Sequence, residues 1–135
     1  MSVRIAAGID ALGDNDEVRV IIIAAEGKHF SSGHDLSGAN DVSLSEVGIS
    51  QWGGLRQPGM EGHWAREEEA YFGLCWRWRN IPKPTIAEVQ GKVIAGGLML
   101  VWPFDIVVAS DDATFQDPVV AFGANGVEYF GHPWE

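Results

Sequence analysis

The chain has 135 residues, of which 46% are hydrophobic and 21% charged, and its formal net charge is −10. This composition is typical of a folded globular protein and excludes a disordered tail. The acidic balance argues against nucleic acid or an anionic membrane surface as a partner, and no apolar run is long enough to cross a bilayer. The single cysteine, Cys75, excludes an internal disulfide. Because the N-terminus lacks an apolar stretch of signal-peptide length, we expect a cytoplasmic protein.

The first third of the chain predicts a helix and then a strand. Weak helical spacing predicts a helix over residues 2–13. Residues 19–25 form a continuous β-branched run, which predicts a strand buried on both faces, as in a parallel sheet. A loop is expected at residues 27–33. Residues 39–60 are polar, rich in Gly and Ser and without a period, so we expect a mobile excursion there.

Residues 65–80 predict an amphipathic helix. Its acidic residues stand in the first turn and its arginines in the last, which suits the helix dipole. Apolar side chains recur along it at i, i+3, i+4 and i+7. These side chains are Tyr71, Leu74, Cys75 and Trp78. We expect this stripe in the core, with Cys75 buried and inert.

The last part of the chain predicts more strands. A strand is predicted at residues 85–89, and a glycine-bearing turn over residues 91–97 leads into a short apolar helix that Pro103 ends. Further strand segments are predicted at residues 105–109 and 114–116. Strands that alternate with helices indicate an α/β protein with parallel strands.

Two loops share one design, with glycine placed where a predicted strand ends. They are residues 30–36 (FSSGHDL) and 93–98 (VIAGGL). Ligands of open α/β sheets bind outside these carboxyl ends. Glycine lets the backbone approach a ligand, and one N–H group from each loop could stabilise a shared oxyanion. Since glycine also serves simple turns, composition alone leaves both interpretations open.

Three segments carry a resemblance to a known family. They read GKHFSSGHDLSG, IPKPTIAEVQGKVIAGGLMLVWPFDIVVAS and DATFQDPVVAFG, and together they resemble the enoyl-CoA hydratase/isomerase (crotonase) superfamily from about Val18 to Gly131. The resemblance implies an α/β fold of the crotonase-like (ClpP/crotonase) type, a ββα-spiral core incomplete at both ends. It implies a single partial domain over residues 1–135, without the N-terminal hairpin and the C-terminal helical region. A completed family fold would form a homo-oligomer, a trimer or a hexamer.

The resemblance also implies the ligand and its site. The ligand is an acyl-CoA thioester, so coenzyme A is part of the substrate, and neither a separate cofactor nor a metal is implied. The thioester carbonyl would lie between the backbone N–H groups of His34 and Gly96, which stabilise an enolate-like anion. The residues that would border the acyl-CoA are Ser32, Gly33, Asp35, Leu36 and Gly97.

The departures from the family pattern concern proton transfer. Hydratases of the family use two glutamates that position a water and move protons, and the corresponding positions here hold Met99 and Val119. Neither side chain exchanges a proton, and general acid–base catalysis contributes about 10²- to 10⁴-fold. The substitute groups we consider are Asp117, Glu128 and His34, each of which also has a solvated or structural interpretation. Glu128 is the hypothetical base, and full turnover by a Glu128→Gln variant would refute it.

Other chemistries fit the sequence poorly. Ser32, His34 and Asp35 stand too close together for a nucleophilic triad, and no G-x-S-x-G elbow is present. His29, His34 and Asp35 lack further ligands at metal spacing.

Two functions therefore remain open. The first is an acyl-CoA-binding enzyme, a lyase or isomerase of the family with chemistry altered from hydration. The second is an inactive, truncated subunit that at most binds acyl-CoA or a full-length paralogue. An incomplete layer would leave apolar regions around Trp76, Trp78 and Trp102 exposed.

Overall fold

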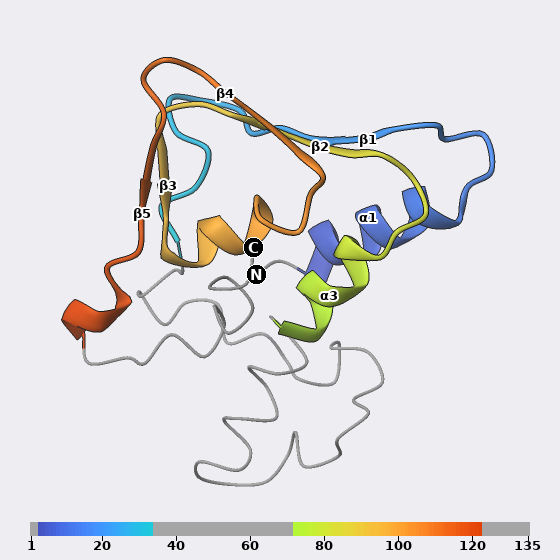
Figure 1. The fold of residues 1–135 in the computed structure, drawn as a ribbon, viewed down its shortest axis with the longest axis horizontal. Coiled ribbons are helices and arrows are strands. Elements are labelled where there is room, and N and C mark those ends of the chain that lie inside the picture. Colours follow the sequence, from blue (N-terminus) through green and yellow to red (C-terminus); the bar gives the residue numbers. More distant parts are fainter. Residues whose placement is uncertain (1–2, 34–71, 123–135) are drawn as a thin grey trace, which may run out of the picture.

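The computed structural model describes residues 3–33 and 72–122, and this part forms two parallel sheets with helices beneath one of them (Figure 1). The helical elements are α1 (Val3–Asp14), α3 (Gly73–Arg79) and the 3-10 helices η2 (Ala95–Leu100) and η3 (Val119–Phe122). The predicted helix over residues 2–13 is confirmed as α1. Of the predicted helix over residues 65–80, the described part contains α3, while the predicted excursion at 39–60 lies outside the described residues.

All strand pairings of the described residues are parallel, as predicted. The three-stranded sheet has the order β1 (Ile21–Ile23), β2 (Thr85–Val89) and β4 (Ile106–Ala109). The second sheet pairs β3 (Lys92–Ile94) with β5 (Thr114–Gln116). The strand at residues 85–89 has its predicted bounds, whereas residues 92–94 form a strand inside the predicted glycine turn. Three residues are too few for an alternation to be recognised, so this strand depends on its neighbours in space.

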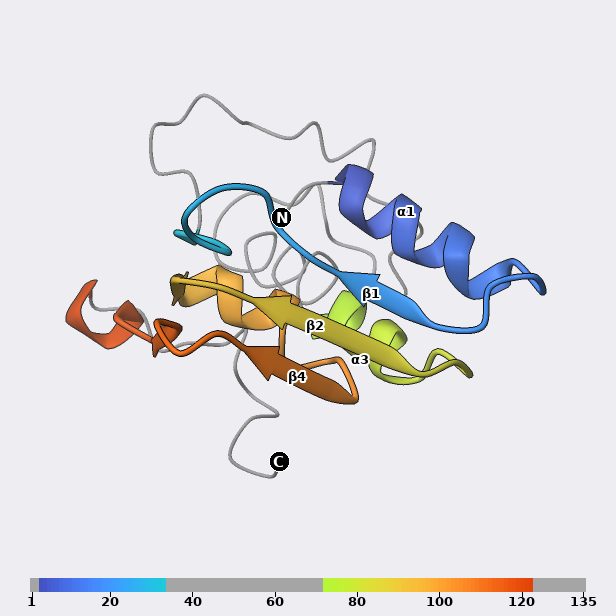
Figure 2. The ribbon, with the colours of Figure 1, turned by 90° about the horizontal axis from the view of Figure 1, so that it is seen from above.

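The expectation that the first strand is buried on both faces is wrong. Ile21 and Ala87 are buried on the face that α1, α3 and η2 cover, but Ile22 is 58% exposed on the opposite face. Ile22 is in register with Ile86, and Ile86 with Ile106, so these side chains form a row across the sheet. The view from above shows the three strands side by side with none of the described helices over them (Figure 2). The sequence around β1 is continuously apolar, but the described helices cover only one face of the sheet.

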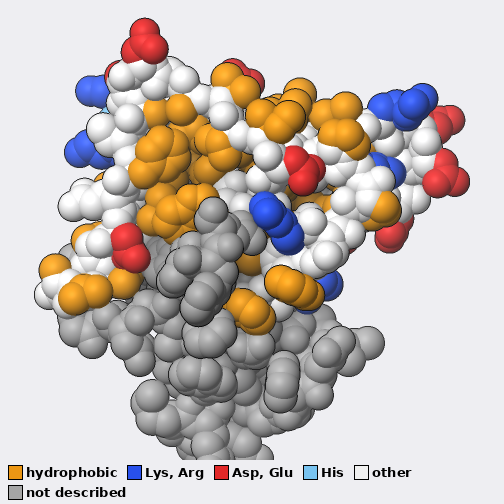
Figure 3. Space-filling model, in the orientation of Figure 1, with side chains coloured by type: hydrophobic (Ala, Val, Ile, Leu, Met, Phe, Trp, Pro, Cys, Tyr) orange, Lys and Arg blue, Asp and Glu red, His pale blue; other side chains and the backbone are white. Residues whose placement is uncertain are grey.

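The core lies between the three-stranded sheet and the helices. Trp78 of α3 is 1% exposed and stacks on Phe104, with the ring centroids 6.2 Å apart. The expected exposure of Trp78 is therefore wrong, whereas its place in the predicted apolar stripe is confirmed. Trp76 is 62% exposed as expected, and Trp102 is partly buried. Exposed hydrophobic side chains also gather between β4 and the β3–β5 pair (Figure 3).

A reciprocal pair of residues joins β2 to the start of β4. Asp105 Oδ2 accepts hydrogen bonds from the backbone N–H (2.9 Å) and the hydroxyl (2.8 Å) of Thr85, and Thr85 Oγ1 accepts one from the backbone N–H of Asp105 (3.0 Å). The bond from the Thr85 N–H, followed by the one from its hydroxyl, lowers the pKa of the Asp105 carboxyl. The pair fixes the register of the two strands at their amino-terminal ends.

Asp105→Asn is expected to reduce the free energy of unfolding at neutral pH by about 1 kcal/mol, because a neutral amide accepts these bonds more weakly. A lowered pKa in the folded state means that the carboxylate stabilises the fold above its ordinary pKa of about 4. This contribution is lost as the pH falls through the folded value. Urea denaturation should therefore show wild type and variant converging below about pH 4. A pH-independent difference would contradict the pairing, and Asp111→Asn, at an exposed aspartate of the next turn, is the control.

Candidate active site

The two glycine loops lie in contact along one side of β3, where the segment that leads to Gly33 runs beside the strand (Figure 1). Ser31 forms a parallel β-bridge with Val93. Its N–H donates to the Lys92 carbonyl oxygen and its own carbonyl oxygen accepts from the Ile94 N–H, both at 3.0 Å. The two loops therefore continue side by side from the end of β3, and not directly from β1 and β2, the strands after which the sequence placed them.

The glycines allow the two backbones to approach each other closely. A Cβ atom on Gly33 would lie 2.9 Å from the Ile94 carbonyl oxygen, and Gly33 has a φ of +92°, which side chains rarely adopt. A Cβ atom on Gly97 would lie 2.7 Å from Ser31 Cβ. Both glycines are thus required by close approach between the loops. The close approach explains both glycines by packing between the loops, and their role in a shared oxyanion site stays a prediction.

Ala95, at the start of η2, has a φ of +48°. Among the residues that the structure describes, it is the one residue other than glycine with a positive φ. A left-handed conformation costs a residue with a Cβ atom about 1–2 kcal/mol. The strain falls on the residue directly before Gly96, at the point where the chain turns from β3 into η2.

Ala95→Gly is expected to raise the free energy of unfolding by about 0.5–1 kcal/mol, because relief of strain exceeds the entropy that glycine adds to the unfolded chain. Thermal and urea denaturation measure the change. Ala113→Gly, at a partly buried alanine without positive φ, should instead destabilise the protein. Equal destabilisation by both substitutions would contradict the assignment of strain to Ala95.

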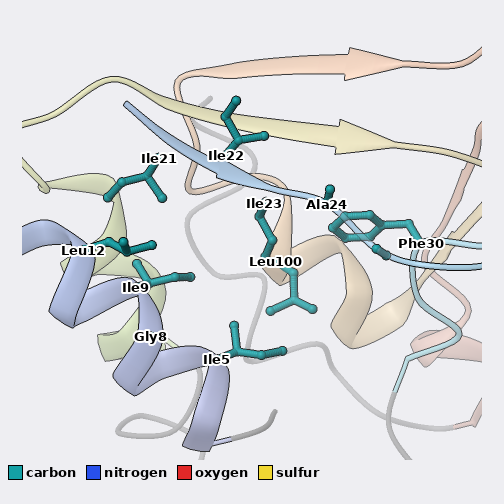
Figure 4. A pocket seen from close by; sticks show the side chains of 11 residues that line it. Ile5, Gly8, Ile9, Leu12, Ile21, Ile22, Ile23, Ala24, Phe30 and Leu100 are labelled. Carbon is teal, nitrogen blue, oxygen red and sulfur yellow. The ribbon is translucent and has the colours of Figure 1, made fainter. Parts of the chain in front are cut away.

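An apolar cavity of about 290 Å³ lies between α1 and β1 (Figure 4). The residues that line it are Ile5, Gly8, Ile9, Leu12, Ile21, Ile22, Ile23, Ala24, Ala25, Phe30 and Leu100. None of these side chains can exchange a proton or hold a metal, so the cavity offers apolar contacts alone. Phe30 and Leu100 connect it to the segments that carry the two glycine loops.

Within residues 3–33 and 72–122 there is no group of three or more side chains that could hold a metal ion. In the same part of the chain, no helix has the length and apolar character needed to span a membrane.

The sequence matches the family model for enoyl-CoA hydratase/isomerase over residues 5–130. The chain belongs to the enoyl-CoA hydratase/isomerase family. The Mycobacterium tuberculosis protein EchA13, whose name assigns it provisionally as an enoyl-CoA hydratase, is 43% identical over all of this chain and 44% of its own length. Human enoyl-CoA hydratase domain-containing protein 3, mitochondrial, is 38% identical over 82% of this chain and 31% of its own length.

Solved structures of the enoyl-CoA hydratase/isomerase family share the fold. A Mycobacterium smegmatis protein, described provisionally as an enoyl-CoA hydratase, superposes with a TM-score of 0.78 and 44% identity over 98% of this chain and 46% of its own. The predicted crotonase-like α/β fold is therefore confirmed. The chain spans less than half the length of these relatives.

The structure describes some of the predicted site residues of this enoyl-CoA hydratase/isomerase chain. It places Gly33 against Ile94 and Ala95, which directly precede Gly96, and it places Gly97 against Ser31, which directly precedes Ser32. Gly96 lies in the first turn of η2, where N–H groups have no acceptor within the helix. Apart from Asp117, the remaining predicted residues lie outside the described part. These are His34, Asp35, Leu36 and Glu128.

The positions at which the family's glutamates were expected lie in apolar surroundings. Met99 is fully buried on η2, and Val119 is buried at the start of η3. Asp117, a predicted substitute acid or base, accepts a hydrogen bond from the Val119 N–H at 3.2 Å through Oδ1. This carboxylate therefore has a structural task at the beginning of η3, and its role in proton transfer stays a prediction.

Cys75 contacts the backbone of Met99: its Sγ donates a hydrogen bond to the Met99 carbonyl oxygen at 3.4 Å. Burial raises the pKa of the Cys75 thiol to about 12. The thiol is protonated at neutral pH, and the thiolate is the nucleophilic form. The predicted inert character of Cys75 is consistent with this environment.

The sequence interpretation missed Ser31. Its hydroxyl oxygen accepts a hydrogen bond from the Gly33 N–H at 3.3 Å, and its Cβ stands against Gly97. A serine hydroxyl often closes a turn by binding the backbone N–H two residues later. The S-x-G spacing was therefore the sequence signal that could have identified Ser31.

Proposed function

We propose that this chain binds an acyl-CoA thioester and that the backbone N–H groups of His34 and Gly96 hold its carbonyl oxygen. The observation that supports this proposal is the close approach of the two loops, in which Gly33 faces the Ile94 carbonyl and Gly97 faces Ser31. One donor directly follows Gly33 in the sequence and the other directly precedes Gly97. Loops held together in this way would keep two donors at one point.

The chemistry that two such donors support is enolate formation. When a proton leaves the carbon next to the thioester carbonyl, negative charge develops on the carbonyl oxygen. Fixed N–H dipoles stabilise this charge without reorganisation, and removing one donor from such a site typically costs about 10²- to 10³-fold in rate. The electrons of the broken C–H bond pass into the enolate, and a separate base takes the proton.

Hydration of the two-glutamate type is not part of the proposed function. The buried Met99 and Val119 side chains can neither position a water nor accept its proton. We propose Glu128 as the base of an altered reaction, with His34 as the other candidate. The same apolar surroundings favour a second function, a subunit that binds acyl-CoA without turning it over.

Calorimetry with two matched ligands tests the proposal. Butyryl-CoA has the thioester carbonyl, whereas S-butyl-CoA is the thioether without it. Two neutral hydrogen bonds should make the protein prefer the thioester by at least about fivefold. Equal affinity for the two ligands would contradict the proposed site. Hydration of crotonyl-CoA, monitored through the loss of enoyl absorbance, should be absent. Turnover of another acyl-CoA would distinguish the enzyme from the binding subunit.

A further inference from the structure

We propose that Ser31 is the positioning residue of the carbonyl site, because its side chain fixes the two glycine loops relative to each other. This inference rests on the proposed function. Ser31 is not among the residues expected to border the ligand. It acts through Gly33 on one side and Gly97 on the other.

The backbone of Ser31 joins the first loop to β3. Its N–H and carbonyl oxygen bond to Lys92 and Ile94, one residue on each side of Val93, at 3.0 Å each. These two bonds fix how far residue 31 stands along β3. They leave the side chain to determine how the chain turns after it.

The hydroxyl group of Ser31 sets the direction of that turn. Oγ accepts the Gly33 N–H at 3.3 Å, and Gly33 has a φ of +92°. A hydroxyl that binds the N–H two residues later closes a local turn. The first proposed donor is the N–H group of the next residue in the sequence, so this hydrogen bond fixes the backbone at Gly33 that leads to it.

The methylene group of Ser31 sets the distance to the second loop. A Cβ atom on Gly97 would lie 2.7 Å from Ser31 Cβ and 2.9 Å from Ser31 Oγ, so the glycine backbone rests directly against this side chain. Gly97 follows the second proposed donor, Gly96. One small side chain therefore touches the neighbours of both donors, which explains why serine and glycine stand opposite each other.

Ser31→Ala tests this role, because it removes Oγ and keeps the methylene contact with Gly97. The preference for butyryl-CoA over S-butyl-CoA is expected to fall about three- to tenfold, the value of one hydrogen bond. The affinity for S-butyl-CoA should be unchanged. Ser110→Ala is the matched control, since Ser110 Oγ also makes a hydrogen bond two residues along, to Asp112, in a loop away from η2. This control should keep the wild-type preference.

The outcomes separate this inference from the proposed function. Without a thioester preference in wild type, the proposed function itself fails. With a wild-type preference, the assignment of Ser31 is overturned if Ser31→Ala retains that preference or weakens both ligands equally, as a merely structural role would. Ser31→Cys, of similar size but with a weak acceptor, provides the same test if the alanine variant does not fold.

Discussion

Trp78→Ala is expected to lower the free energy of unfolding by about 3–5 kcal/mol, a large part of the stability of a small domain. Trp78 is 1% exposed, and its indole ring stacks on Phe104 at an interplanar angle of 12°. The substitution would leave a cavity between α3 and the sheet that the surrounding side chains cannot refill. Urea denaturation at neutral pH measures the loss.

Trp76→Ala is the matched control on the same helix. Trp76 is 62% exposed and stacks on Phe72 with centroids 6.4 Å apart, so its loss should cost less than about 1 kcal/mol. Trp78→Phe should lie between the two alanine variants. It keeps an aromatic ring against Phe104 and removes an Nε1 group that is buried without a partner among the described residues. Similar losses for Trp76→Ala and Trp78→Ala would contradict the described core.

Gly97→Ala is expected to abolish the preference for butyryl-CoA over S-butyl-CoA, since it perturbs both proposed hydrogen bonds. The new Cβ atom would lie 2.7 Å from Ser31 Cβ, so the two loops must separate for it to fit. Overpacking of this kind also costs about 1–3 kcal/mol in stability. Calorimetry with the two ligands and urea denaturation measure the two effects separately.

Gly91→Ala distinguishes damage to the site from general destabilisation. Gly91 has a φ of +58°, and a Cβ atom there would collide with the Lys28 carbonyl oxygen and the His29 ring. It precedes β3, whereas Gly97 follows it. Gly91→Ala should therefore destabilise the protein and leave the ligand preference intact. A comparable loss of preference in both variants would show that the Gly97 contact is not specific to the site.

The sequence predicted most strongly those elements whose periodicity is local. The strand at residues 85–89 and the helix that became α1 have their predicted places because their patterns extend over enough residues. Trp78 shows the same point. The apolar stripe that it shares with Leu74 predicted that Trp78 is buried, whereas the expected incomplete layer predicted that it is exposed. Trp78 is buried, so the prediction from periodicity was right.

What the sequence did not predict depends on contacts between distant segments. The three residues of β3 form a strand because Ser31 pairs on one side and β5 on the other. The exposure of Ile22 depends on which face the helices cover, and a continuous apolar run does not contain that information. Within the candidate site, the shared design of the two glycine loops indicated one common site, but the contact between Ser31 and Gly97 depends on how the two segments are aligned.

Isotope-edited infrared spectroscopy of butyryl-CoA labelled at its carbonyl carbon tests the two-amide site most directly. Two fixed N–H donors polarise the carbonyl more than water does, so its stretching frequency should be lower in the bound ligand than in free solution. This shift should be smaller in Gly97→Ala and unchanged in Gly91→Ala. A bound carbonyl that absorbs at or above its frequency in water would contradict a site in which two backbone N–H groups hold the thioester oxygen.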